Sequence, residues 1–213
     1  MLLVYRKLRF SVSYRELEEM THMDGDSIDH STLARWVIRF ASLIEKQVKK
    51  RKKPSKGVWS MDETYLKLKG KPIYLYRAVD SNGDTISLRL SKKRDKAAVL
   101  SFFRKALAEN KRPAKVNIDK SGSNLAGLVS INKNLSEEQQ IQIRQGKYLN
   151  NRVEQDHRFI KKRTRPMLGF KSFRAAKVTI AGIESVRMIQ KGQVLDYDRG
   201  RYAFENYQAL MAA

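Results

Sequence analysis

The chain has 213 residues, of which 44 are Lys or Arg and 22 are Asp or Glu, so its formal net charge is +22. Hydrophobic residues make up 41% of the chain, which is enough to bury a core and excludes a wholly disordered basic tail. The absence of cysteine excludes disulfide scaffolds and thiolate zinc sites, and no segment has the pattern of a membrane span or a secretory signal. We therefore expect a cytoplasmic protein without a membrane partner. Its charge fits a polyanionic partner, above all nucleic acid.

Residues 1–45 are expected to be helical. Ser13 is followed three positions later by Glu16, a capping-box pattern that predicts the start of a helix. A second helix is expected to open at His30 after a polar connector, with apolar residues at helical spacing. Two short helices joined by a turn fit a helix-turn-helix, and a helical hairpin that only packs on the main domain is the alternative. The cations expected to reach DNA from the second helix are Arg35 and Arg39.

A basic boundary is expected at residues 46–57. Seven of the eleven residues from Lys46 to Lys56 are Lys or Arg, none is acidic, and Pro54 prevents a helix from continuing. Such a run is usually a solvated linker, and in a chain of this charge it is also expected to contact nucleic-acid phosphates. The cations expected to make these contacts are Lys49, Lys50, Arg51, Lys52 and Lys53.

The pattern becomes strand-like at Val58. Three strands are expected at 58–68, 73–79 and 85–90, the last two joined by a turn that contains Asn82-Gly83. The elements expected after them are a helix over 95–110, a strand over 114–119, a helix over 124–129, a short strand near 141–143, and helices over 151–164 and 173–190. This order predicts an α/β fold over 58–192, a mixed sheet flanked by helices as in ribonuclease-H-like domains. The C-terminal tail, 193–213, has no clear pattern.

Three isolated acids in this basic chain are candidate metal ligands. Asp62 lies in the first predicted strand and Asp119 ends the fourth, and these strands are neighbours in the predicted sheet. Glu154 follows after 34 intervening residues, one turn into a basic helix. Three converging carboxylates can hold two Mg²⁺ ions, which suits phosphoryl transfer on nucleic acid.

Other interpretations of these acids remain open at this point. An Asp at the end of a strand is more often a turn or cap residue. Glu63 could replace Asp62, although adjacent positions of a strand face opposite ways and only one of them can point inward. Glu154 could belong to a solvated basic face that it shares with His157.

Taken together, the motifs resemble the DDE transposases of bacterial insertion sequences, and most closely the insertion-sequence six family. The matching segments cover nearly the whole chain. They are Ser13 to Met20, Asp29 to Val37, Met61-Asp62-Glu63-Thr64-Tyr65, Tyr74 to Asp80, Asp119-Lys120, Asn150 to His157, Arg163 to Phe173 and Gly182-Ile183-Glu184. The family's chain begins earlier than Met1, so we expect the DNA-binding module to be incomplete at its N-terminus.

The resemblance implies a site and an activity. Asp62, Asp119 and Glu154 would be the catalytic residues and the ligands of two Mg²⁺ ions, for which Mn²⁺ can substitute. The implied activity is binding of the element's terminal inverted repeats, metal-dependent strand cleavage, and transfer of the freed 3′-OH to target DNA. Replicative transposition by a homodimer or higher multimer on the bacterial nucleoid is also implied. The cations expected to contact DNA near these acids are Lys120, Arg158, Lys161 and Arg165.

Two other functions remain open. One is a truncated relative that binds element ends as a repressor without cutting them. The other is a structural RNA-binding protein, which fits the charge but leaves the three acids unexplained. His157 has two open roles as well, because it could orient a phosphate or water or simply belong to a helix face.

Overall fold

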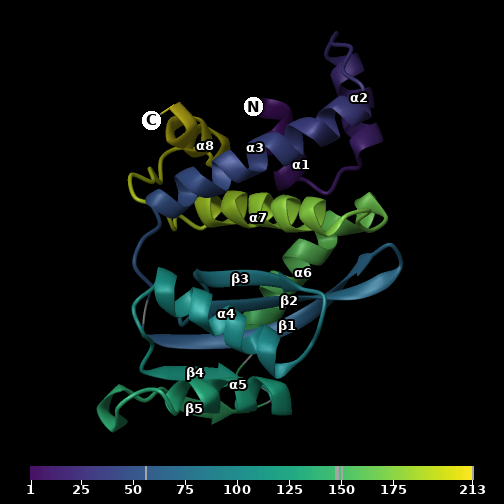
Figure 1. Ribbon diagram of the computed structural model, residues 1–213. Coiled ribbons are helices and arrows are strands. Elements are labelled where there is room, and N and C mark those ends of the chain that lie inside the picture. Colours follow the sequence, from purple (N-terminus) through teal and green to yellow (C-terminus); the bar gives the residue numbers. More distant parts are fainter. Residues whose placement is uncertain (56, 147–148, 150, 213) are drawn as a thin grey trace. The chain divides into compact units, whose positions relative to one another are not determined.

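The structure is a computed structural model that describes residues 1–55, 57–146, 149 and 151–212 (Figure 1). Lys56 of the predicted boundary and Asn150 of the predicted motif therefore lie outside the described residues. The chain divides into two compact units. The first unit consists of residues 1–53, 68–70 and 159–213, and the second of 54–67 and 71–158.

The first unit is helical. Its helices are α1 (Leu2–Arg9), α2 (Tyr14–Met23), α3 (His30–Lys50), the C-terminal end of α6 (Asn151–Thr164), the 3-10 turn η3 (Arg165–Met167), α7 (Phe173–Gln190) and α8 (Ala203–Ala212). None of the helices in the described part of the chain combines the length and apolar character that a membrane crossing needs.

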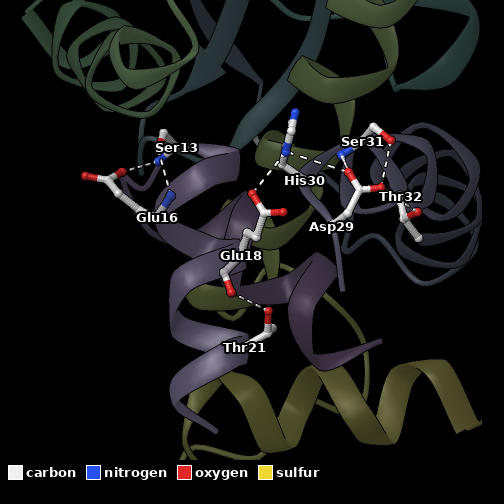
Figure 2. Close-up of polar contacts among 8 residues, drawn as sticks. All are labelled: Ser13, Glu16, Glu18, Thr21, Asp29, His30, Ser31 and Thr32. Carbon is white, nitrogen blue, oxygen red and sulfur yellow. Dashed lines mark hydrogen bonds and ion pairs between the residues drawn. The ribbon is translucent and has the colours of Figure 1, made fainter. Parts of the chain in front are cut away.

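Side-chain caps start α2 and α3 (Figure 2). The predicted capping box is present at α2, where the Ser13 hydroxyl accepts from the backbone N–H of Glu16 at 3.0 Å and the Glu16 carboxylate accepts from the Ser13 N–H. Asp29 caps α3 by accepting from the backbone N–H of Ser31 at 2.6 Å. These caps fix the chain's entry into both helices and thereby define the turn between them.

Close packing of α7 against α3 and α1 forms the core of the first unit. Gly182 in the middle of α7 allows this approach, because a Cβ there would lie 2.7 Å from the Ala41 Cβ and 3.0 Å from the Leu8 methyl groups. The C-terminal helix joins the same core through ring contacts of Tyr207 and Phe204 with Tyr5, at centroid distances of 4.9 and 5.0 Å.

The second unit contains a five-stranded mixed sheet of order β3-β2-β1-β4-β5. Its strands are β1 (Val58–Leu68), β2 (Lys71–Asp80), β3 (Thr85–Ser91), β4 (Lys115–Ile118) and β5 (Gln142–Gln145). The β2–β3 pair is antiparallel, whereas β4 lies parallel to both β1 and β5. The predicted turn joins β2 to β3, with Gly83 at a φ of 82° and the Asp80 carboxylate accepting from the backbone N–H groups of Asn82 and Asp84.

Helices cover the sheet of the second unit. Its core lies between one sheet face and the helices α4 (Lys96–Glu109) and α5 (Gly122–Asn132), with Trp59, Phe102 and Leu128 fully buried. A 3-10 turn, η1 (Glu137–Gln139), lies between α5 and β5. The first part of α6 is attached to the sheet by a buried ion pair between Arg77 of β2 and Asp156, with 3.3 Å between Nη2 and Oδ2. The mixed sheet flanked by helices confirms the predicted ribonuclease-H-like fold class.

The observed elements extend or correct several predictions. Helix α3 continues to Lys50, past the expected boundary at 46, because its apolar stripe continues through Ile44 to the buried Val48. The following residues are paired rather than free, since the Lys53 N–H donates to the Gln193 carbonyl at 3.0 Å and Lys52 bridges Val194. The tail without a clear pattern contains α8.

Candidate active site

Asp62 lies in β1, and Asp119 directly follows β4, the parallel neighbour of β1. The parallel register of β1 and β4 pairs Ser60 with Asn117, and the Asn117 amide donates to the Ser60 hydroxyl at 3.1 Å. Continued by two residues along both strands, this register leads to Asp62 and Asp119, and the charge of Asp119 acts on Asp62. The neighbouring strands that the sequence predicts therefore bring the two acids to one edge of the sheet.

The charges of three carboxylates meet at Asp62. Burial, followed by the charge of Glu63, raises the pKa of Asp62 to about 7, and the charges of Asp119 and Glu154 contribute in the same direction. Only 19% of the Asp62 side chain is exposed. The neighbouring carboxylates disfavour ionisation of Asp62, which a bound cation would reverse.

Helix α6 places Glu154 at this site. The Arg77–Asp156 ion pair holds the helix on the sheet, and His157 Nε2 lies 3.6 Å from Asp62 Oδ2. Glu154 lies one turn before the buried His157 and is itself exposed, at the border between the sheet-facing side of α6 and solvent. The sequence predicts Glu154 from its position on this helix, but not the buried ion pair that positions the helix.

Glu63 points to the opposite face of β1 and is bound by other groups. Its carboxylate accepts from Arg94 Nε at 2.6 Å and from the Asn124 amide at 2.8 Å. The same Asn124 amide donates to Asp119 Oδ1 at 3.0 Å, and the Ser121 N–H donates to that oxygen too. Glu63 therefore orients Asp119 through Asn124, and this geometry favours Asp62 over Glu63 as the ligand on β1.

The donor set fits a hard divalent cation. All three candidate ligands offer carboxylate oxygens, which Mg²⁺ and Mn²⁺ prefer, and no thiol is present in the chain. Their oxygens do not all lie within 4.8 Å of one another, so they do not form a closed cage around a single ion. Such an open set suits ions that keep waters and share substrate phosphates.

A tighter group of potential ligands lies in the first unit, where oxygens of Glu18 and Asp29 and a nitrogen of His30 lie within 4.8 Å of one another (Figure 2). Its contacts have structural explanations. Asp29 caps α3, and His30 Nδ1 lies 3.0 Å from the Glu18 carboxylate of α2. These contacts join α2 to the start of α3 across the turn.

The cations predicted to bind DNA occupy different environments. In the first unit the exposed ones are Arg35, Arg39, Lys49, Lys50, Lys53 and Arg165, and the half-buried ones are Arg51, Lys52 and Lys161. In the second unit Lys120 and Arg158 are both exposed. Lys49 pairs with Glu45, and the Lys53 ammonium donates to the Gly192 carbonyl, each at 2.8 Å.

Sequence reasoning missed the residues that support the candidate ligands. Arg77 had a detectable signal, because it is a lone charge within an otherwise apolar predicted strand. Arg94 and Asn124 had none, since each lies in a polar segment next to a helix start and only the folded chain brings it to Glu63.

Comparisons with solved structures find similar folds at low sequence identity. The HTLV-2 integrase catalytic core domain in complex with magnesium is 18% identical, with 74% of this chain and 99% of that chain covered and a TM-score of 0.47. The catalytic core domain of BIV integrase is also 18% identical, with 73% and 95% covered and a TM-score of 0.48.

Sequence comparisons identify the family. A family model described as a DDE domain matches residues 56–193. The transposase for insertion sequence-like element IS431mec of Staphylococcus aureus is 36% identical over 185 residues, which cover 86% of this chain and 80% of the relative. The transposase for insertion sequence element IS257 in transposon Tn4003, also from Staphylococcus aureus, matches to the same extent. The chain therefore belongs to the DDE transposases of bacterial insertion sequences, in the insertion-sequence six family, which are metal-dependent enzymes of DNA phosphoryl transfer.

Proposed function

We propose that this transposase binds the terminal inverted repeats of its element, cleaves a strand at each end and joins the freed 3′-OH to target DNA. The observation that supports this most is the meeting of the Asp62, Asp119 and Glu154 charges at one edge of the sheet. Helices α2 and α3 would bind the repeats as a helix-turn-helix, with Arg35 and Arg39 exposed on the second helix. A homodimer or higher multimer would bring the two ends together.

The three acids would hold two Mg²⁺ ions. When bound, such ions polarise the scissile phosphate and stabilise the attacking and leaving oxygens. In cleavage, a water oxygen attacks the phosphorus while the bond to O3′ breaks, leaving a 3′-OH and a 5′-phosphate. In transfer, that 3′-OH attacks a target phosphorus and displaces the target's own O3′, so each step exchanges one P–O bond for another.

The chain's own residues set the geometry of these steps. Asn124 orients Asp119, while the Arg77–Asp156 pair fixes the helix of Glu154. His157, whose Nε2 lies 3.6 Å from Asp62 Oδ2, would orient a phosphate or the attacking water. The exposed Lys120 and Arg158 can hold the DNA backbone beside the acids.

A strand-transfer assay with a duplex of the terminal inverted repeat, target DNA and Mg²⁺ tests this proposal. Glu154→Gln removes a ligand charge and should abolish both cleavage and transfer while leaving duplex affinity unchanged or slightly higher. Glu137→Gln is the matched control, because Glu137 is exposed on η1 outside the three acids. Wild-type chain that binds the duplex but never cuts it would favour the repressor. Near wild-type cutting by Glu154→Gln would remove Glu154 from the ligand set.

A further inference from the structure

The first unit contains a concave pocket of about 810 Å³ between α3 and the segment that leads from η3 into α7. Four cations line it, and none of the lining residues is acidic. Arg35 and Arg39 come from α3, Lys171 lies just before α7, and Arg174 lies in its first turn. Two segments more than 120 residues apart in the sequence thus contribute equally to one cationic pocket.

Part of the wall of this pocket is apolar. Ile38 of α3 and the buried Phe170 are among its lining residues, so the cations adjoin hydrophobic surface. A duplex backbone lies along a surface and has no apolar face to place against such a wall. A single nucleotide out of the stack has both a phosphate for the cations and a base face for the apolar side chains.

Leu168 lies next to the pocket and is 97% exposed. It has a left-handed backbone, with a φ of 51°, a conformation that is unfavourable for leucine and that the surrounding structure must impose. Contacts fix the chain on both sides of the turn. The Arg163 guanidinium donates to the Arg9 carbonyl at 3.0 Å, and the Phe170 carbonyl accepts from the Lys69 N–H at 2.9 Å.

A leucine held outward on a fixed turn beside cations has the form of an apolar wedge. Side chains of this kind insert between base steps and unstack them in proteins that distort DNA. We propose that Leu168 enters the base stack at the element end and that the adjoining pocket binds the nucleotide that it displaces. This inference rests on the proposed DNA binding, to which it adds a defined distortion of the DNA.

End duplexes with 2-aminopurine placed at successive positions test this inference, because the fluorescence of this base rises when it leaves the stack. The full-length wild-type chain should raise the fluorescence several-fold at one position or two adjacent ones. Leu168→Ala should remove most of that rise while the duplex is still bound, and Leu168→Phe should retain it. Tyr202→Ala, which truncates another exposed large side chain of the first unit outside α2 and α3, is the control and should leave the rise intact.

The pocket is tested separately. Ser42→Phe would fill it without changing its charge, and Arg174→Ala would remove one lining cation. Both should lower the fluorescence rise, whereas Lys177→Ala removes an exposed cation of α7 outside the pocket and should not. Circular dichroism melting confirms that each variant is folded.

Different outcomes refute different claims. Wild-type chain that binds the duplexes without a rise at any position overturns this inference and leaves the proposed function standing. An undiminished rise with Leu168→Ala overturns the wedge. A chain that binds no end duplex refutes the proposed function, and this inference with it.

Discussion

Gly127 sets the distance between α5 and α4, and replacing it with alanine should lower the stability of the second unit. A Cβ at Gly127 would lie 2.4 Å from Val99 Cγ1 and 2.9 Å from Val99 Cβ. Carbon atoms in favourable contact are ~3.5–4.0 Å apart, so the helices would have to separate by roughly 1 Å. Overpacking of this kind costs ~1–3 kcal/mol, and the gain in helix propensity from Gly to Ala returns ~1 kcal/mol. We expect Gly127→Ala to lower the free energy of unfolding by about 1 kcal/mol.

Two variants control this experiment. Gly122→Ala adds the same methyl group at the first residue of the same helix, where nothing lies within 4 Å, and should change stability by less than ~0.5 kcal/mol. Val99→Ala combined with Gly127→Ala removes the atoms that clash, so the double variant should be more stable than the sum of its single changes by ~1 kcal/mol or more.

Urea unfolding followed by tryptophan fluorescence measures these differences. Trp59 is fully buried in the core of the second unit, and a Trp36→Phe background leaves it as the only tryptophan. Asn124 lies one turn before Gly127 and orients Asp119. The rate of strand cleavage by Gly127→Ala should therefore fall by more than the decrease in its folded fraction explains. Equal stability of Gly127→Ala and Gly122→Ala would refute the packing argument.

Three further predictions concern charge. Burial lowers the pKa of Lys7 to about 8 from 10.5, with Glu16 opposing the shift, so the unfolded chain binds more protons between these values. The free energy of unfolding of the first unit should therefore rise from pH 8 to 10.5 by up to roughly 3 kcal/mol. If the melting temperature of Lys7→Met rose over this pH range as much as that of the wild-type chain, the prediction would be wrong. Asp62→Asn should raise the metal-free melting temperature, because an ionised Asp62 is destabilising above pH 7. The same variant should lose most of the stabilisation by Mg²⁺, and a rise in melting temperature with Mg²⁺ as large as that of the wild-type chain would exclude Asp62 as a ligand. Affinity for end duplexes, measured by fluorescence anisotropy, should fall by ~10³-fold or more between 50 and 200 mM salt if six or more phosphates are neutralised, and salt-independent binding would contradict a phosphate-dominated interface.

Local patterns predicted most of the elements. The strand Val58–Leu68 and the helices Asn151–Thr164 and Phe173–Gln190 have the expected bounds, because turn residues, caps and the spacing of apolar residues determine each of them within a short window. The same patterns predicted that β1 and β4 are neighbours, and in the parallel pair that they form the charge of Asp119 acts on Asp62. That these acids bind metal remains a prediction.

Long-range contacts account for what the sequence did not reveal. Helix α8 packs through Tyr207 and Phe204 on Tyr5, about 200 residues earlier in the chain. Lys171 and Arg174 belong to an ordinary basic segment until the fold places them opposite Arg35. No local pattern encodes such a pairing, because it arises from the packing of whole helices.

A change of metal preference tests the central claim, that these carboxylates hold the ions of phosphoryl transfer. Asp62→Cys exchanges a carboxylate for a thiolate, which Mg²⁺ binds poorly and the softer Mn²⁺ accepts more readily. In strand transfer with an end duplex, we expect this variant to be inactive with Mg²⁺ and to regain activity with Mn²⁺, while the wild-type chain uses both ions. Strand transfer by Asp62→Cys at close to the wild-type rate in Mg²⁺ would contradict the account.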